Sequence, residues 1–251
     1  MAGLRIAAAQ IACVPGDLQA NIRRHCVFID AAAEALTELL VFPELSLTGY
    51  DLPGMAANAL SADDARLDPI RERAARLAMT IMVGAPLANR SGLPYIGAIA
   101  FQPDGRSVVY RKHFLHASEE RFAAAGSAVS QLIDVRGVPV ALAICADTSN
   151  QQHPHAAVMA GATLYAAGSV ISASGYAREA AMLSGYAKLF DIGILLANHA
   201  VETGGYLCAG RSAVWLPGGQ LLIEAAGQGE LLVTADEDSG AIVPVDTSAC
   251  H

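Results

Sequence analysis

A glutamate, a lysine and a cysteine each stand at the end of an apolar run in this sequence: Glu44, Lys112 and Cys145. Proteins built from helices packed on sheets often carry their functional groups at such strand ends. A carboxylate, an ammonium and a thiol brought together would supply a base, a stabiliser of negative charge and a nucleophile. Each residue alone also has an ordinary interpretation, as an exposed loop glutamate, a solvated lysine or a packed cysteine.

Cys145 is the most informative of the three positions. It ends the apolar run Val138–Ile144, at the point where the chain must turn toward the next helix. The N–H groups and dipole of a helix N-terminus would favour a thiolate there. The alternative is a buried structural cysteine, because free cysteine is among the most buried residue types. We expect the other four cysteines to be of that kind: Cys13, Cys26, Cys208 and Cys250.

Lys112 is followed at a distance of seven residues by Glu119, and then by Glu120. A second carboxylate beside the lysine would hold it in place. An acidic surface helix would produce the same pattern, so the residues alone leave both readings open.

Short apolar runs alternate with stretches of helical spacing along the chain. Continuously apolar strands indicate sheets that are buried on both faces, with helices outside them. We therefore expect one domain over residues 1–251 with two stacked mixed sheets, and a poorly ordered tail after about residue 245. The expected strands are Leu4–Gln10, Leu39–Phe42, Thr80–Pro86, Pro94–Gln102, Arg106–Lys112, Ser130–Val135, Val138–Ile144, Thr163–Ala167, Ile192–Asn198, Leu207–Leu216, Gln220–Ala225 and Gly229–Asp236, and the expected helices are Asp17–Leu36, Asp64–Met79, His155–Ala160 and Gly175–Phe190.

The composition argues against large anionic partners. The chain has 251 residues and a formal net charge of -8, and its basic residues do not cluster. Nucleic acids and anionic membranes bind to basic surfaces, so neither is expected as a partner. Only 16% of the residues are charged, against roughly 25% in ordinary soluble domains. This shortage suggests that part of the surface is covered by self-association.

The cysteines and the N-terminal segment suggest a location. Five cysteines, an odd number, are spread without the spacing of a zinc or redox motif, which favours a reducing compartment. No signal peptide is evident in Met1–Gln10, and no apolar run is long enough to cross a bilayer. We expect a cytoplasmic protein.

The order and surroundings of these segments resemble the nitrilase superfamily of carbon–nitrogen hydrolases over nearly the whole chain. Each segment alone is weak evidence for the family, and the resemblance rests on the occurrence of all the segments in the same order. The matching segments are Ala9-Gln10 with Gly16-Asp17 and Asn21, Phe42-Pro43-Glu44-Leu45 through Thr48-Gly49-Tyr50, Tyr110-Arg111-Lys112 with Leu115, Glu119 and Gly126, Ile144-Cys145-Ala146-Asp147, Gly161-Ala162, Ala197-Asn198, Gly210-Arg211-Ser212 and Pro217-Gly218-Gly219. Ala146 and Phe114 depart from the family pattern, where an aromatic or acidic residue and a histidine are usual.

The resemblance implies a four-layer α-β-β-α sandwich and a triad of Glu44, Lys112 and Cys145, with Glu119 rather than Glu120 as the second glutamate. In the mechanism that we expect, Glu44 is the base, and Lys112 and the backbone N–H of Ala146 stabilise the oxyanion. No metal or organic cofactor is required, because the chain supplies every reacting group.

The expected substrate is a small or medium amide. The loops around the site should determine specificity, and Tyr50 and Ser169 are the candidate substrate contacts. The resemblance also implies a homodimer or higher homo-oligomer.

Several alternatives stay open on the sequence alone. Within the superfamily, the substrate could be a nitrile or an N-carbamoyl compound, and the acyl group could pass to an amine instead of water. A protease-like site could pair Cys145 with His113 or His199. From a different class, a non-catalytic binding or scaffold protein could share the fold. A fused synthetase is not expected for a chain of this length.

Overall fold

The computed structural model describes residues 3–127 and 129–250. Residues 1–2, 128 and 251 of the expected single domain therefore lie outside the described residues. None of the helices in the described chain combines the length and the apolar character needed to cross a lipid bilayer.

The first sheet has seven strands in the order β13-β12-β1-β2-β3-β4-β5. Its centre, β1-β2-β3, is parallel, and the strands on either side of that centre are antiparallel, so the sheet is mixed. The strand bounds are β1 Ile6–Gln10, β2 Leu39–Val41, β3 Thr80–Leu87, β4 Tyr95–Phe101, β5 Ser107–Arg111, β12 Leu231–Ala235 and β13 Gly240–Pro244.

The second sheet has six strands in the order β11-β10-β9-β8-β7-β6. Strands β7, β8 and β9 are parallel to one another, and β6 and β10 pair with them antiparallel. The strand bounds are β6 Leu132–Val135, β7 Val138–Ile144, β8 Leu164–Ser169, β9 Gly193–Asn198, β10 Ala213–Trp215 and β11 Leu221–Glu224.

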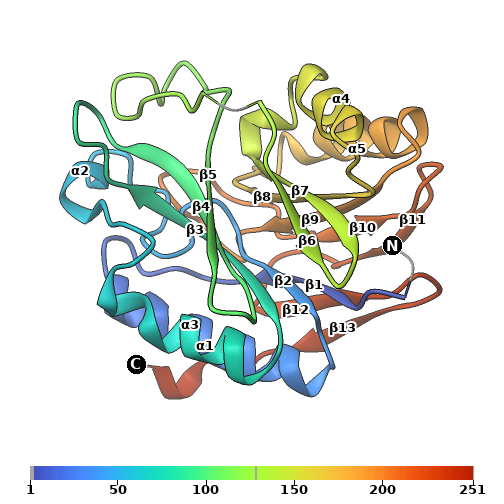
Figure 1. Ribbon diagram of the computed structural model, residues 1–251, viewed down its shortest axis with the longest axis horizontal. Helices are drawn as coiled ribbons and strands as arrows, with labels where there is room; N and C mark the ends of the chain where they lie inside the picture. The colour runs from blue at the N-terminus through green and yellow to red at the C-terminus, as the bar shows by residue number, and fades with distance from the viewer. Residues whose placement is uncertain (1–2, 128, 251) are drawn as a thin grey trace.

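Helices cover the outer face of each sheet (Figure 1). Helices α1 (Leu18–Glu34) and α3 (Asp68–Arg76) pack on the first sheet, and α4 (Gln152–Met159) and α5 (Tyr176–Leu189) pack on the second. A third apolar cluster lies between the two sheets. The structure thus confirms the α-β-β-α order of layers that the sequence predicted.

Alternation along the central strands explains how one strand serves two layers. In β1, Ile6 and Ala8 face the other sheet, while Ala7 and Ala9 face α1 and α3. Every residue of this strand is buried. Such a strand is apolar on both faces, which is why the sequence shows continuous runs, and its one polar residue, Gln10, has its side chain hydrogen-bonded to backbone groups of Gly227, Gly229 and Ser212.

Several element bounds differ from the expected ones. The run Leu207–Leu216 forms only the short strand β10, while β13 and the short helix α2 (Met55–Asn58) were not expected. The expected helix over Asp64–Met79 is divided into a 3-10 turn, Ala65–Leu67, and α3. The pairing of β13 with β12 explains why a weakly apolar segment becomes a strand.

The segment after Val245 is anchored by hydrogen bonds. The Thr247 hydroxyl accepts a hydrogen bond from Arg24 and donates one to Glu230. Thr247 is buried, and a 3-10 turn follows at Ser248–Cys250. A buried guanidinium on α1 thus contacts this segment, and the order of the tail stays a prediction.

Candidate active site

The sequence-predicted residues come from both sheets. Glu44 follows β2 and Lys112 follows β5 in the first sheet, while Cys145 follows β7 in the second. Their side chains meet between the sheets, at one end of the sandwich.

Lys112 lies between two buried carboxylates. Its Nζ donates to Glu44 Oε1 at 2.6 Å and to Glu119 Oε1 at 2.7 Å. The side chains of all three are 0% exposed. Burial works to lower the pKa of Lys112, but the negative charges of Glu44 and Glu119 outweigh it and raise that pKa, so the ammonium stays charged. An ammonium has three N–H donors, and the two bonds to carboxylates leave the third for another acceptor.

Glu44 is prepared to accept a proton. Burial raises its pKa from 4.5 to about 7, although the charge of Lys112 opposes this shift. Among the described residues, its Oε2 has no hydrogen-bond partner. The Cys145 thiol lies near enough to affect the pKa of Glu44, without forming a hydrogen bond of ordinary geometry. A buried, unpaired carboxylate oxygen beside a thiol is suited to take the thiol proton.

Cys145 occupies a strained turn and carries a neutral thiol. Its φ of 42° lies in the left-handed region, which is unfavourable for a residue with a side chain. Burial and the nearby charge of Glu44 raise the pKa of the thiol well above its ordinary value. The expectation that a helix N-terminus would favour the thiolate is therefore wrong at rest, because the turn that follows, Cys145–Asp147, is a single 3-10 turn.

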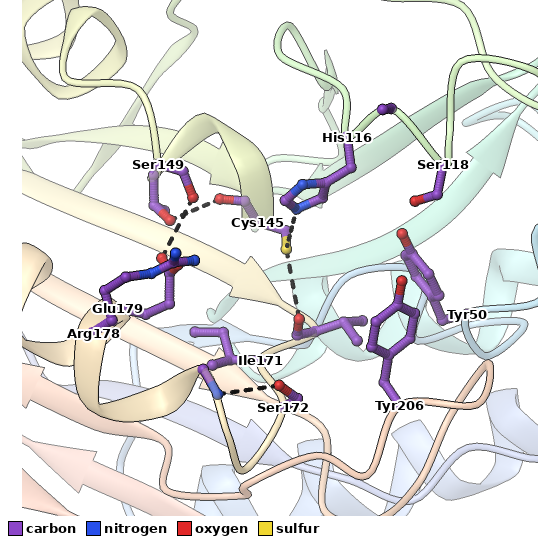
Figure 2. Close-up of a pocket in the computed structure, with 14 residues that line it drawn as sticks. Tyr50, His116, Ser118, Cys145, Ser149, Ile171, Ser172, Arg178, Glu179 and Tyr206 are labelled. Atoms are coloured by element: carbon purple, nitrogen blue, oxygen red, sulfur yellow. Dashed lines mark hydrogen bonds and ion pairs between the residues drawn. The ribbon is translucent and has the colours of Figure 1, made fainter.

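The sulfur of Cys145 faces a cavity of about 400 Å³ (Figure 2). Cys145 itself is only 8% exposed, so the cavity gives access to little more than its sulfur. The lining residues are polar and apolar in similar measure: Tyr50, His116, Ala117, Ser118, Cys145, Thr148, Ser149, Val170, Ile171, Ser172, Gly175, Arg178, Glu179 and Tyr206.

The two candidate substrate contacts are placed differently. Tyr50 lines the cavity, and its hydroxyl donates to Glu119 Oε1 at 2.6 Å. Ser169 is fully buried and is not among the residues that line the cavity, so its assignment as a substrate contact stays a prediction without support from this geometry. Alternation along β8 explains this: Tyr165 and Ala167, two and four residues earlier, pack on the helix layer, and Ser169 lies on their side. The next residue, Val170, reaches the cavity instead.

The backbone around Glu44 is held by close packing against two strands. A side chain at Gly84 of β3 would collide with the backbone of Pro43 and Leu45, and one at Gly168 of β8 would collide with Phe42. Glycine at both positions lets strands of the two sheets approach the turn.

Asp147 ties the nucleophile turn to the segment that follows Lys112. Its Oδ1 accepts from the backbone N–H groups of His113 and Phe114, at 3.1 and 2.9 Å. Its Oδ2 accepts from Tyr110 and from the backbone of Ile144, at 2.7 and 3.0 Å. The carboxylate thus fixes the relative position of the segments that carry Lys112 and Cys145, which come from different sheets.

The histidines named in the protease-like alternative do not approach the sulfur. His199 Nε2 donates to the backbone oxygen of Glu44 at 2.8 Å, and His113 Nδ1 lies 2.9 Å from the backbone oxygen of Gly126. Burial lowers the pKa of His199 to about 4, so it is neutral and structural.

Sequence reasoning missed the histidine that does contact the Cys145 sulfur. His116 Nε2 lies 3.7 Å from Cys145 Sγ, on the cavity wall. In the sequence, the only signal that could have indicated His116 is its position in the loop that precedes Glu119.

No group of three or more His, Cys, Asp or Glu side chains in residues 3–127 and 129–250 is arranged to hold a metal ion.

Comparison with known proteins gives three findings. The model of the carbon–nitrogen hydrolase family matches residues 5–245. An amidase from Nesterenkonia sp. AN1 has a similar structure, with a TM-score of 0.85 and 26% identity over 93% of this chain and 92% of that one. The glutamine-dependent NAD(+) synthetase of Thermotoga maritima is 23% identical over 238 residues, which are 91% of this chain and 39% of that protein. The chain thus spans about two-fifths of the length of this curated relative.

Two structures of the Nesterenkonia amidase contain small amides. In a glutamate-to-glutamine variant, acrylamide has added to the active-site cysteine. A cysteine-to-alanine variant of the same enzyme, with a TM-score of 0.86 to this chain, holds butyramide.

Proposed function

This chain belongs to the carbon–nitrogen hydrolase family of the nitrilase superfamily, and we propose that it hydrolyses a small or medium carboxamide through a thioester on Cys145. One observation carries the proposal: a lysine between two buried carboxylates lies beside a cavity whose wall contains a cysteine sulfur. A protein without a reaction to perform would gain little from three buried ionisable groups, because their desolvation is costly.

In the acylation step, the Cys145 thiol gives its proton to Glu44 Oε2, and the sulfur attacks the amide carbon. The carbonyl oxygen becomes negative as the carbon–sulfur bond forms. The third N–H of Lys112 and the backbone N–H of Ala146 stabilise it; the latter lies in the single 3-10 turn Cys145–Asp147, at the start of which an N–H has no acceptor within the turn. Glu44 then gives the proton to the nitrogen, the carbon–nitrogen bond breaks, and ammonia or an amine leaves.

In the deacylation step, water takes the place of the departed nitrogen. Glu44 accepts a proton from the water as its oxygen attacks the thioester. The carbon–sulfur bond breaks, the sulfur recovers a proton from Glu44, and the carboxylic acid is released. All reacting groups belong to the chain and to the substrate, so the scheme uses no metal or organic cofactor.

The cavity supports a substrate of modest size. A volume of about 400 Å³ accommodates a short acyl group. The amidase from Nesterenkonia, which binds butyramide, supports the choice of an amide over a nitrile or N-carbamoyl compound. A panel of amides, nitriles, carbamoyl compounds and glutamine, assayed for ammonia release, would establish the substrate class.

The central test is replacement of the nucleophile. Cys145→Ala should abolish ammonia release from the amide panel while the protein remains folded, since the removed sulfur is a small part of the core. Intact-mass spectrometry of the Glu44→Gln variant after incubation with acrylamide should show one added molecule, located on Cys145. Retained turnover by Cys145→Ala, or an adduct on another cysteine, would contradict the thioester scheme.

The role of Lys112 can be tested with an internal control, because the chain has only one other lysine, the exposed Lys188. Lys112→Met should lower kcat by at least about 100-fold, as expected for loss of an oxyanion donor. Lys188→Met should leave kcat unchanged. A nearly silent Lys112→Met would overturn the oxyanion assignment.

A non-catalytic binding protein is the alternative from a different class. If the folded wild-type chain releases no ammonia and forms no adduct with any member of the panel, the binding role is preferred.

A further inference from the structure

We propose that His116 is a catalytic residue of this site, whose Nε2 accepts a hydrogen bond from the N–H of the carboxamide that is cleaved. The inference rests on the proposed amide hydrolysis and assigns a role to a side chain outside the Glu-Lys-Cys triad.

The position of the imidazole supports this role. His116 Nε2 lies 3.7 Å from Cys145 Sγ, and Figure 2 shows the ring directed toward the sulfur from the cavity side. Glu44 approaches the same sulfur, but it is buried and does not line the cavity. Because His116 lines the cavity and its Nε2 is 3.7 Å from the sulfur, a substrate that reaches the sulfur through the cavity lies near His116.

The loop around His116 is fixed by the same carboxylate that holds the lysine. The His116 N–H donates to Glu119 Oε2 at 2.9 Å, and the Glu119 N–H donates back to the His116 carbonyl at 2.8 Å. Glu119 Oε1 meanwhile accepts from Lys112 and Tyr50. One side chain thus orients the oxyanion donor and the backbone of His116 together.

The hydrogen-bonding needs of a primary amide explain why an imidazole is useful here. The amide oxygen accepts, and Lys112 and the Ala146 N–H are the donors for it. The amide nitrogen carries two N–H donors, which need two acceptors. Glu44 is one, and His116 Nε2 is a side-chain acceptor 3.7 Å from the sulfur on the cavity side, where the backbone oxygen of Val170 lies at the same distance.

The imidazole is in the state that this role requires. His116 is exposed on the cavity wall, and partial desolvation and the positive charge of Lys112 lower its pKa below the ordinary value, so the ring is neutral at pH 7. With the proton on Nδ1, Nε2 is an acceptor. Glu44, and not His116, still supplies the proton that the leaving nitrogen gains.

Comparing an amide with its ester tests this role, because an ester has no N–H to donate. We would measure kcat/KM of wild type, His116→Phe and His116→Gln with butyramide and with methyl butyrate. His116→Phe should lower the value for the amide about three- to tenfold and change the value for the ester by less than about twofold, as expected for one neutral hydrogen bond. His116→Gln, whose carbonyl can accept the same hydrogen bond, should retain more of the amide rate.

Both substrates form the same butyryl thioester, so the comparison isolates the step in which the leaving groups differ. His155→Phe, an exposed histidine on α4, is the matched control and should alter neither rate. An equal loss on both substrates, or no loss on the amide, would overturn the role of His116 while leaving the proposed hydrolysis intact. A wild-type chain that releases no ammonia from any amide would instead remove both proposals.

Discussion

At the scale of single residues, the unusual feature is a cluster of three ionisable side chains that are shielded from solvent. Lys112 and the carboxylates of Glu44 and Glu119 lie entirely inside the protein. Such a cluster adds little to the free energy of unfolding, because the free-energy cost of removing the charges from water is about as large as the gain from their attraction. Its value is chemical: burial makes Glu44 a stronger base than an exposed glutamate, and Lys112 keeps its charge where negative charge develops.

The two neighbouring glutamates give a direct test of this arrangement. Glu119 is buried and bonded to Lys112, whereas Glu120 is exposed. Glu119→Gln should lower kcat at least about tenfold, since it removes a charge-assisted bond to Lys112 and the acceptor that fixes the loop. Glu120→Gln should be silent in the same ammonia-release assay. A larger loss from Glu120→Gln would move the second glutamate to that position.

The pKa of Glu44 sets a pH dependence whose sign follows from its role. The carboxylate is the form that accepts the thiol proton, so activity requires pH values above its pKa. Because that pKa is raised from 4.5 to about 7, kcat/KM for butyramide should fall as the pH drops below about 7. Glu120→Gln serves as a control and should leave the profile unchanged. An acid limb near 4.5, the ordinary value, would show that Glu44 is not the base.

At the scale of elements, the turns that follow the strands hold Glu44 and Cys145 in place. The turn that carries Glu44 lies against Gly84 of β3 and Gly168 of β8, with no space for a side chain at either position. On the other sheet, the left-handed turn at Cys145 directs the sulfur toward the cavity. Asp147 joins the two sides through bonds to both segments.

Two glycine-to-alanine variants distinguish the effect of a steric clash at a closely packed glycine from the effect of adding a methyl group where space is free. In Gly84→Ala, the added methyl group would meet backbone atoms of Pro43 and Leu45, so the turn must move and Glu44 with it. We expect activity to fall by at least about 100-fold, as for other misplaced catalytic groups, and the free energy of unfolding in urea to decrease. Gly185→Ala lies in α5 with open space around it and should keep full activity, with a gain of about 1 kcal/mol in stability. If Gly84→Ala were fully active, the close approach would not position Glu44.

At the scale of the whole molecule, the site exists only because the two sheets pack against each other. The first sheet carries Glu44 and Lys112, which we propose as the base and the oxyanion donor, and the second carries Cys145, the proposed nucleophile. The outer helices cover the sheets with one face and expose the opposite face at the surface of the protein. Met159 and Leu189, at the C-terminal ends of α4 and α5, are 74% and 62% exposed.

These exposed side chains, together with the low content of charged residues, lead us to propose self-association through the layer of α4 and α5. Sedimentation equilibrium should detect a dimer or higher oligomer of the wild-type chain. The double variant Met159→Glu/Leu189→Glu should shift it toward monomer. Leu36 is also 62% exposed, but it follows α1 in the opposite layer. Leu36→Glu is therefore the control and should leave the oligomeric state unchanged. A wild-type chain that sediments as a monomer at all concentrations would contradict the proposal.

The sequence by itself determined the layers and the residues that the two sheets bring together. Continuous apolar runs predict strands that are buried on both faces. An ionisable residue directly after such a run therefore lies at the end of a buried strand. The periodicity left Glu44, Lys112 and Cys145 as candidates with ordinary alternatives, and the resemblance to the nitrilase superfamily singled out these three residues and favoured Glu119 over Glu120.

The tertiary structure alone decided what surrounds those groups. It placed Ser169 in the helix layer and Val170 on the cavity, brought His116 and not His113 or His199 to the sulfur, and left Cys145 as a neutral thiol. Each outcome depends on which faces of distant segments meet and how much water they exclude. Local periodicity fixes the direction of a side chain relative to its own strand, whereas burial and electrostatics depend on every element packed against it.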